Sequence, residues 1–266
     1  MSAPIIYIPH GGGPMPLFNE PNHHRLIQFL KNIRNDLGKP KAILVISAHW
    51  EEDVATVSSA AFPELIYDYY GFPEESYQVD YSAPGEPKLA REVVDMLRQN
   101  GIEAREDENR GFDHGTFVPL KLLFPNADIP VIQLSLTNDL DPQKQIDSGK
   151  AIFELSHQNI LILGSGLSFH NLQVLMSKDP DVYKKSEKFD NWLNQVVVDH
   201  DLNEKQKESA LVNWKNAEEA RFSHPREEHL LPLHVCFGAA LKAGKKAVNI
   251  FNETFLGTKV SGFLWQ

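Results

Sequence analysis

Short apolar runs rich in β-branched residues alternate along this chain with longer amphipathic stretches. Strands interleaved with helices produce such an alternation, whereas an all-helical or an all-β chain does not. The pattern therefore predicts an α/β fold in which helices cover both faces of a central sheet. The predicted strands are residues 5–8, 42–47, 54–58, 130–135, 160–163, 247–251 and 260–264. The predicted helices are residues 24–37, 87–99, 142–155, 184–200, 204–213 and 231–243.

The chain has 266 residues, of which 42% are hydrophobic, so it can bury a large core. That length suits one large α/β domain better than two small ones. No repeat of fixed period, low-complexity tract or flexible linker divides the pattern. We therefore expect a single catalytic domain over residues 1–266.

Charge and cysteine content narrow the partners and the location. The 36 acidic and 26 basic residues give a net charge of −10 without an obvious basic stripe, so nucleic acid and anionic membranes are poor partners. Cys236 is the only cysteine, which excludes an intrachain disulfide and favours a reducing compartment. The N-terminal segment lacks the basic region and the long apolar run of a signal peptide or membrane anchor. We expect a cytoplasmic protein.

Three of the eleven histidines follow predicted strands. His10, His49 and His170 each lie a few residues beyond the carboxyl end of a strand. Ligands of α/β sheets bind beyond these ends, so residues distant in sequence can converge there. A single histidine after a strand is usually a hydrogen-bonded loop residue. Three of them together favour a metal site.

Further histidines occur in two other segments, one of which contains His114 and the other His224, His229 and His234. The last three are spaced by five residues, which on a continuous helix would separate neighbours by about 140°. They cannot all face one ion from a helix. Pro232 suits the first turn of the last predicted helix, with His229 in the loop just before it. We therefore expect His229 to point inward as a ligand and His234 to pack within the helix.

Other catalytic motifs fit less well. The glycines after His10 match neither the phosphate-binding nor the dinucleotide-binding loop. Residues 164–168 do not fit the G-x-S-x-G elbow of serine hydrolases, and H-E-x-x-H is absent. Cys236 lies between apolar residues and is expected to be a buried small hydrophobe. Glu227 and Glu228 could be ligand carboxylates, although solvated or first-turn charges are the more common role.

The longest irregular stretch, residues 62–84, is rich in aromatic side chains. These could line or cover a pocket for a flat ring, or fold back on the core, and the sequence leaves both interpretations open. They are Tyr67, Tyr69, Tyr70, Phe72, Tyr77 and Tyr81.

Five short motifs resemble those of the class III extradiol ring-cleaving dioxygenases, most closely the DOPA 4,5-dioxygenase-like branch. They occur in family order between residues 10 and 233, so the resemblance spans nearly the whole chain. Each motif alone is weak, but five in order are specific. The motifs are His10-Gly-Gly-Gly-Pro, Ser47-Ala-His49-Trp50, Asp113-His114-Gly-Thr, Ser168-Phe-His170-Asn171 and His224-Pro-Arg-Glu-Glu-His229-Leu-Leu-Pro-Leu.

The resemblance implies a three-layer α/β/α domain around a central mixed, mostly parallel sheet. It also implies that His10, His49 and His229 are the metal ligands. His170 would be the catalytic acid–base residue, and His114 a second catalytic histidine that binds substrate or transfers protons. The implied activity is the opening of a catechol ring by O2 to a muconic semialdehyde at a non-haem Fe(II) ion.

One departure from the family concerns the third ligand. The protocatechuate branch has a carboxylate where this chain has His229, so three neutral imidazoles replace the usual two histidines and one carboxylate. The ion would keep its full dipositive charge, which favours a catecholate anion and also suits zinc. We therefore expect Fe(II) for activity and Zn(II) as the ion found in purified protein.

Two other functions stay open. A zinc hydrolase also combines three histidines with an open coordination position, and a related fold occurs in non-enzymatic metal-binding interaction modules. His114 and His170 favour chemistry, because metal retention alone would not require them. The expected partners are a small-molecule catechol and O2, while the identity of the catechol and the formation of a homodimer stay undetermined. Arg226 could pair with a substrate carboxylate or with neighbouring glutamates at the surface.

Overall fold

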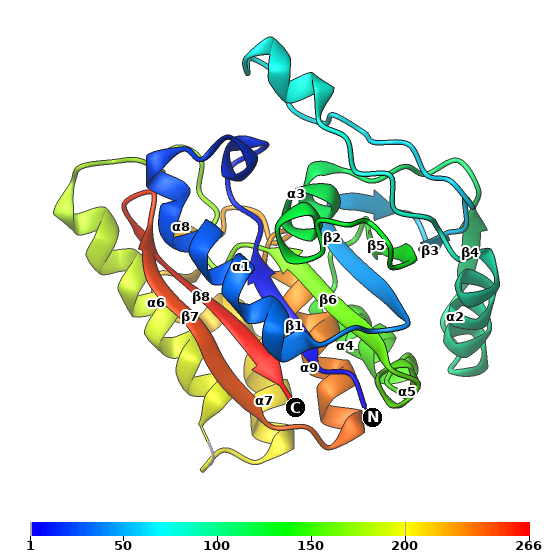
Figure 1. The fold of residues 1–266 in the computed structure, drawn as a ribbon. Coiled ribbons are helices and arrows are strands. Elements are labelled where there is room, and N and C mark those ends of the chain that lie inside the picture. The colour runs from blue at the N-terminus through cyan, green and yellow to red at the C-terminus, as the bar shows by residue number, and fades with distance from the viewer. Residues whose placement is uncertain (1, 200) are drawn as a thin grey trace.

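The computed structural model describes residues 2–199 and 201–266, and within these residues the strands form one sheet (Figure 1). The strands are β1 (Ile5–Pro9), β2 (Ala42–Glu52), β3 (Ala55–Ser58), β4 (Ala104–Asp107), β5 (Val131–Thr137), β6 (Ile160–Gly166), β7 (Ala247–Phe255) and β8 (Thr258–Trp265). Their order across the sheet is β4-β3-β5-β2-β6-β1-β8-β7.

The middle of the sheet is parallel and is flanked on both sides by antiparallel pairs, while β4 at one edge runs parallel to β3. β1 pairs with β6, β6 with β2, and β2 with β5, all in parallel. β8 runs antiparallel to both β1 and β7, and β3 meets β5 in an antiparallel contact. The carboxyl ends of β1, β2, β5 and β6 therefore lie along one edge, where open α/β sheets bind their ligands.

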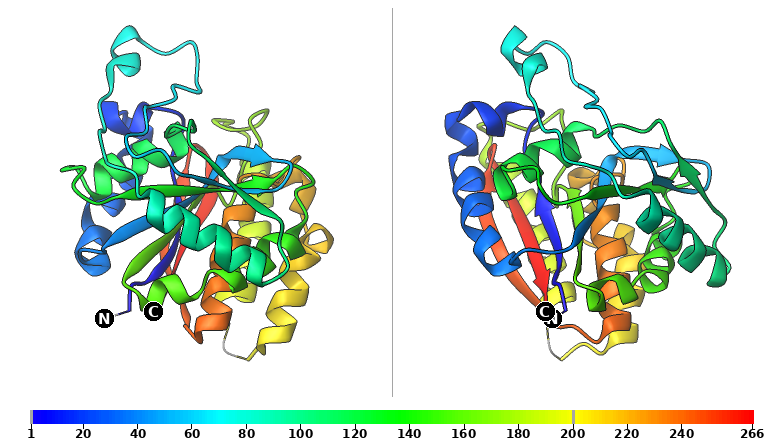
Figure 2. Two further views of the ribbon diagram at one scale, coloured as in Figure 1. Left: turned by 90° about the vertical axis from the view of Figure 1, so that its right-hand side faces the viewer. Right: turned by 45° about the vertical axis from the view of Figure 1, so that its right-hand side comes forward.

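Helices cover both faces of the sheet. The α-helices are α1 (His24–Leu37), α2 (Pro87–Gln99), α3 (His114–Leu123), α4 (Pro142–Ala151), α5 (Glu154–His157), α6 (Pro180–Val198), α7 (Glu204–Val212), α8 (Ala220–Ser223) and α9 (Leu231–Ala243), and the 3-10 helices are η1 (Met15–Phe18), η2 (Pro21–His23), η3 (Glu74–Gln78) and η4 (Trp214–Asn216). α1 and α3 cover one face of the sheet, and α2, α4, α6 and α9 cover the other (Figure 2). The expected three-layer α/β/α arrangement with a mixed sheet is confirmed. Within the described ranges, no helix combines the length and apolarity needed to cross a membrane.

Successive residues of the central strands belong to different cores. In β1, Ile5 and Tyr7 are fully buried in the core beneath α4 and α9, while Ile6 and Ile8 are fully buried in the core beneath α1 and α3. Side chains of a strand alternate between the two faces of its sheet. Because both faces are covered, the strand is apolar throughout, which is why it was recognisable in the sequence.

Close contact between α4 and α9 depends on glycine. A Cβ atom added at Gly149 would lie 2.0 Å from the carbonyl oxygen of Val235, and one at Gly238 would lie 2.0 Å from that of Ile146. The two helix backbones can approach this closely only without those side chains. Since α9 begins shortly after His229, this contact helps to place the loop that carries His229.

Three predicted helices, residues 24–37, 87–99 and 231–243, have the bounds that the structure shows. The prediction of one continuous helix over residues 142–155 was wrong. The helix ends at Ala151, and the amide of Ile152 donates to the carbonyl of Gly149 at 3.2 Å in a tighter turn.

The predicted helix 184–200 begins earlier, at Pro180, where the side chain of Asp179 accepts a hydrogen bond from the first turn. Its predicted end, His200, lies outside the described residues.

The most consequential difference concerns β2, which was predicted to end at Ser47 but continues to Glu52. Its pairing with β5 shifts register between Ile46 and Glu51. His49 therefore lies within an irregular part of the strand, not after it. The sequence also missed β4, which is short and polar, and α3, whose almost complete burial removes the amphipathic pattern.

Candidate functional site

Five histidines gather at the carboxyl edge of the parallel strands. His10 follows β1 directly, His49 lies near the end of β2, and His170 lies just beyond β6. His114 is the first residue of α3, and His229 lies in the turn before α9. Since β6 lies between β1 and β2, the ends of these three strands are neighbours in the sheet. The structure thus brings together every histidine that the sequence singled out for the site.

The rings of His10, His49 and His229 surround a common point. The Nε2 atoms of His10 and His49 are 3.2 Å apart. The ring centre of His229 lies 5.2 Å from that of His10 and 4.9 Å from that of His49. Three imidazoles at this spacing can serve one divalent ion.

The potential ligand atoms in this region fall into two neighbouring groups. In the first, formed by His10, His49 and His114, the ligand atoms all lie within 4.8 Å of one another, and the same holds for the second, formed by His170, Glu228 and His229. The expected ligand set takes members from both groups. Its assignment therefore stays a proposal.

The Nδ1 atoms of the buried histidines face oxygen acceptors outside the cluster. His229 Nδ1 lies 2.9 Å from Glu228 Oε1, and His114 Nδ1 lies 2.8 Å from Asp68 Oδ1. A carboxylate can only accept, so each Nδ1 carries the proton and leaves Nε2 as the basic atom.

His10 is oriented in the same way by a hydroxyl group. Its Nδ1 lies 3.2 Å from Ser165 Oγ, which donates its own hydrogen to the carbonyl of Gly115. The hydroxyl therefore accepts from His10. His10 Nε2 is left free to bind an ion beside His49.

Burial and crowding keep the proposed ligands neutral. Burial, followed by the neighbouring imidazoles, holds the pKa of His10 and of His229 well below the ordinary value for histidine. Burial and the adjacent His114 lower the pKa of His49 to about 3, against the opposing influence of Asp68. Neutral imidazole is the form that coordinates a metal ion.

Both carboxylates are held in the ionised form. Burial alone would raise the pKa of Asp68, but the hydrogen bond from His114 and the nearby His49 lower it overall. Burial opposes ionisation of Glu228 as well, yet the contact with His170 brings the pKa of Glu228 below its ordinary value. At neutral pH Asp68 thus accepts a hydrogen bond from His114 and Glu228 accepts one from His229, while His49 and His170 lie at 3.6 and 3.1 Å from these carboxylates.

The site is buried on one side and reachable on the other. His10 is 1% exposed and His229 is 4% exposed. The side chains of His49 and His170 are 20% and 15% exposed. His49 and His170 are therefore more accessible to solvent than His10 and His229.

Glycines let the surrounding backbone approach the cluster. A Cβ atom at Gly115 would lie 2.9 Å from the ring of His49, and one at Gly166 would lie 2.2 Å from the carbonyl oxygen of His229. That carbonyl accepts hydrogen bonds from the hydroxyl of Tyr7, at 3.0 Å, and from the amide of Leu167. The turn before α9 is thus fixed to β1 and to the end of β6.

The other two histidines of the segment that contains His229 are structural. His234 is fully buried and its Nε2 donates to the carbonyl of Leu211 at 2.9 Å, which confirms the predicted helix packing. His224 is also fully buried, and its Nε2 donates to the carbonyl of Ser168 at 2.8 Å. It supports the loop that carries His170.

Sequence reasoning missed Asp68 and preferred a solvated role for Glu228. Glu227 turns away, toward Arg221 and Lys215, whereas Glu228 turns toward the histidines. No local pattern distinguishes the two glutamates. The position of Asp68 among the aromatic residues of the irregular stretch 62–84 was the only available signal for it.

The irregular stretch of residues 62–84 forms an arm that carries η3 and stands out from the body of the molecule (Figure 1). Most of its aromatics fold back on the core, as the second interpretation held, and Tyr69 and Tyr81 are buried in it. Tyr69 lies 5.8 Å from His114, measured between ring centres, so it borders the site. Tyr67 and Tyr77 pack against the core, while Tyr70 is 92% exposed.

Arg226 forms a surface ion pair close to the site. Its guanidinium contacts both carboxylate oxygens of Glu51, at 2.6 and 2.5 Å, and lies 3.4 Å from Glu228. The predicted pairing with a neighbouring glutamate is confirmed for Glu228.

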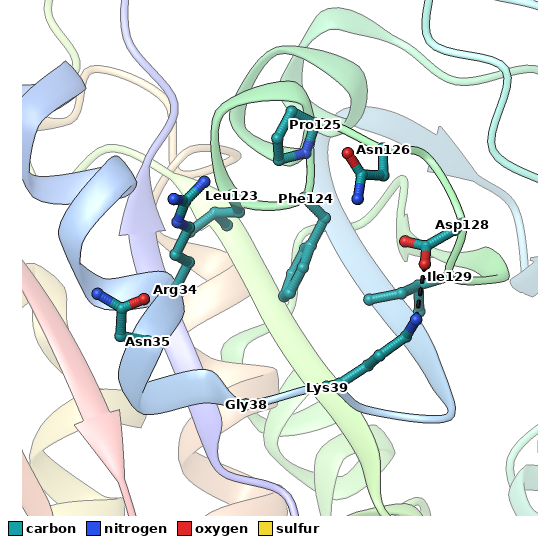
Figure 3. A pocket seen from close by; sticks show the side chains of 10 residues that line it. All are labelled: Arg34, Asn35, Gly38, Lys39, Leu123, Phe124, Pro125, Asn126, Asp128 and Ile129. Carbon is teal, nitrogen blue, oxygen red and sulfur yellow. Dashed lines mark hydrogen bonds and ion pairs between the residues drawn. The ribbon is translucent and has the colours of Figure 1, made fainter.

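A separate pocket lies near the amino ends of the parallel strands, opposite the histidines (Figure 3). It opens between the end of α1 and the loop from α3 to β5, where Lys39 and Asp128 form an ion pair at 2.6 Å. Its lining residues precede β2 and β5, so the length of these strands separates it from the histidines. The lining residues are Arg34, Asn35, Gly38, Lys39, Leu123, Phe124, Pro125, Asn126, Asp128 and Ile129.

The chain matches known proteins along nearly its whole length. The family described as the catalytic LigB subunit of aromatic ring-opening dioxygenase matches residues 3–261. Dioxygenase tasH of Hapsidospora irregularis is 37% identical, over 99% of this chain and 85% of the relative. The 4,5-DOPA dioxygenase extradiol of Beta vulgaris is 40% identical, over 88% of this chain and 86% of the relative.

A solved structure also resembles this chain over nearly its whole length. The crystal structure of an uncharacterized protein from Escherichia coli K12 has a TM-score of 0.79 and 25% identity, covering 98% of this chain and 99% of the other. A 4,5-DOPA dioxygenase extradiol of the same strain is 31% identical over 89% of this chain and 84% of the relative. The chain belongs to the LigB family of extradiol aromatic ring-opening dioxygenases, in its DOPA dioxygenase-like branch, and is an enzyme of that class.

Proposed function

We propose that this enzyme is a non-haem Fe(II) dioxygenase that opens a catechol ring and incorporates both atoms of O2 to give a muconic semialdehyde. Residues 1–266 would act as one catalytic domain. The observation that supports this most strongly is the convergence of five imidazoles at one strand edge, with outward-facing Nδ1 atoms at His10, His114 and His229.

His10, His49 and His229 would hold the ion. The Nε2 atoms of His10 and His49 face each other, and the ring of His229 lies 5.2 and 4.9 Å from theirs, measured between ring centres. Burial keeps the three imidazoles neutral, and such a set suits divalent iron or zinc. Bound Fe(II) would supply the electron transfer between catechol and O2 that neither molecule undergoes readily alone. Zinc has no accessible redox state, so it would occupy the site without supporting the reaction.

His170 and His114 would transfer protons. His114 Nδ1 is engaged by Asp68 and His170 Nδ1 lies 3.1 Å from Glu228, so Nε2 is the atom free to take a proton from a catechol hydroxyl in each case. The carboxylates would stabilise the imidazolium that forms. Such positioned acid–base groups contribute about 10²–10⁴ in rate.

The names of several relatives identify DOPA as their substrate, and we propose a catechol of this kind here. Arg226 forms ion pairs with Glu51 and with Glu228, so its charge is already balanced by two glutamates. A substrate carboxylate would have to displace Glu51 from Arg226. Catechols with and without a carboxylate therefore belong in the same substrate panel.

The test uses protein stripped of metal and reloaded anaerobically with either Fe(II) or Zn(II). With Fe(II), we expect O2 consumption matched one to one by a yellow ring-opened product from at least one catechol of a panel that includes DOPA. With Zn(II), we expect neither. Full activity with zinc alone, or product formation without O2 uptake, would refute the redox role and favour a zinc hydrolase.

The zinc hydrolase and the non-enzymatic interaction module, the two alternatives that the sequence left open, are set aside, since the chain belongs to a family of ring-opening dioxygenases. Three imidazoles suit zinc as well as iron, so O2 uptake decides which metal supports the reaction.

A further inference from the structure

Glu228 occupies an unusual place between two histidines for which different roles are proposed. Its Oε1 atom lies 2.9 Å from Nδ1 of His229 and 3.1 Å from Nδ1 of His170. The two imidazole rings stack, with their centres 3.4 Å apart and their planes inclined by 17°. One oxygen atom therefore faces the same nitrogen of a proposed metal ligand and of the proposed acid–base residue.

The second oxygen of Glu228 is anchored on the other side. Glu228 Oε2 lies 3.4 Å from Arg226, which Glu51 holds through both carboxylate oxygens. Glu51 belongs to β2, two residues after His49. The carboxylate is thus held between the end of β2 and the two histidines, and Arg226 balances part of its charge.

The side chain of Glu228 is largely shielded from solvent, so solvent weakens its contacts with the two histidines only slightly. It is 12% exposed, and the side chains of His229 and His170 are 5% and 15% exposed. Charge-assisted contacts in such surroundings are stronger than those between exposed groups. An outer carboxylate of this kind fixes the tautomer and orientation of a ligating histidine and raises its basicity.

We propose that Glu228 is a positioning residue that acts through two histidines at once, orienting His229 as a metal ligand and His170 for proton transfer. The part that concerns His170 rests on the proposed dioxygenase function. The part that concerns His229 requires only that the site binds a divalent ion.

The adjacent Glu227 provides a matched control. It has the same side chain and is 11% exposed, but its partners are Arg221 and Lys215, away from the histidines. Replacing either glutamate by glutamine removes one charge of a shielded ion pair at nearly the same position. Only Glu228→Gln alters the contacts of the site.

The first measurement is the dissociation constant for Zn(II) alone, obtained by competition with a chromophoric chelator. We expect Glu228→Gln to weaken zinc binding about 10–100-fold, the usual effect of losing such an outer partner. Glu227→Gln should change it by less than about twofold, because it lies outside the network. Equal effects of the two substitutions would overturn the role toward His229.

The second measurement is a double-mutant cycle with His170→Ala, using kcat of protein saturated with Fe(II). Alone, Glu228→Gln should lower kcat about 10–100-fold. In the His170→Ala background it should lower kcat no further, while zinc binding should still weaken, because that effect passes through His229.

A loss of kcat that is fully additive with His170→Ala would overturn the role toward His170. These failures differ from failure of the proposed function itself. If wild-type protein loaded with Fe(II) opened no catechol, the dioxygenase assignment would fall, while zinc competition would still decide whether Glu228 positions His229.

Discussion

His49 and His170 are both partly exposed imidazoles at the strand edge, and their surroundings differ in a way that fits the different roles proposed for them. His49 Nε2 lies 3.2 Å from that of His10, at the centre of the cluster. His170 stacks on the outer side of His229 and contacts Glu228. His49→Ala should therefore lose the metal, whereas His170→Ala should keep it and lose about 10²–10⁴ in kcat.

Metal content after dialysis and O2 uptake at saturating Fe(II) measure these two effects separately. The division of roles would be wrong if His170→Ala emptied the site, or if His49→Ala kept a full complement of metal. His157→Ala, at an exposed position on α5, serves as the unaffected control.

The residues of the site also differ in how far the sequence alone predicts them. The histidines could be predicted because each follows a recognisable element and belongs to a motif. Glu228 could not be distinguished from Glu227, because the direction of two adjacent side chains depends on how the turn before α9 is held. Tyr7, Leu167 and Gly166 hold that turn, and all three are distant from it in sequence.

At the scale of elements, the crossing of α4 and α9 leaves no room for a side chain at its two glycines. Gly149→Ala would place a methyl group 2.0 Å from the carbonyl oxygen of Val235. Alanine favours an isolated helix over glycine by up to about 1 kcal/mol. Forced separation of packed elements costs about 1–3 kcal/mol and outweighs that gain. We expect Gly149→Ala to lower the free energy of unfolding.

Urea denaturation of the metal-free protein measures this change. Lys144→Ala, at an exposed position on the same helix, should change the free energy of unfolding by less than about 1 kcal/mol. A Gly149→Ala protein as stable as wild type would mean that α4 and α9 can separate without cost.

Elements with a clear period were predicted well, and those without one were missed. α1 and α2 each present one apolar stripe, and their bounds agree with prediction. α3 is buried nearly all round and contains Pro119, so no stripe is visible. β2 was predicted too short because its continuous apolar run ends before Ser47, although the strand continues to Glu52 and carries His49.

For the whole molecule, a bound ion would connect segments that are far apart in the chain. The proposed ligands follow β1, lie within β2 and precede α9. An ion that binds only the folded state stabilises it by about 2.7 kcal/mol at a hundredfold excess over its dissociation constant. We therefore expect zinc at that excess to raise the melting temperature by about 5–10 °C.

Differential scanning calorimetry with and without a chelator measures this shift. His229→Ala should melt at nearly the same temperature in both conditions, because one ligand is missing. An equal shift in His229→Ala and in wild-type protein would place the ion elsewhere.

The sequence alone determined the α/β class, the positions of most strands and helices, and the set of histidines, because these depend on local periodicity and short motifs. Tertiary structure decided which atoms of those histidines face inward, since Asp68 reaches His114, Ser165 reaches His10 and Glu228 reaches His170 from other segments. It also decided which of two adjacent glutamates joins the site. Side-chain direction is set by packing and hydrogen bonds between elements distant in the chain, and no local pattern records those contacts.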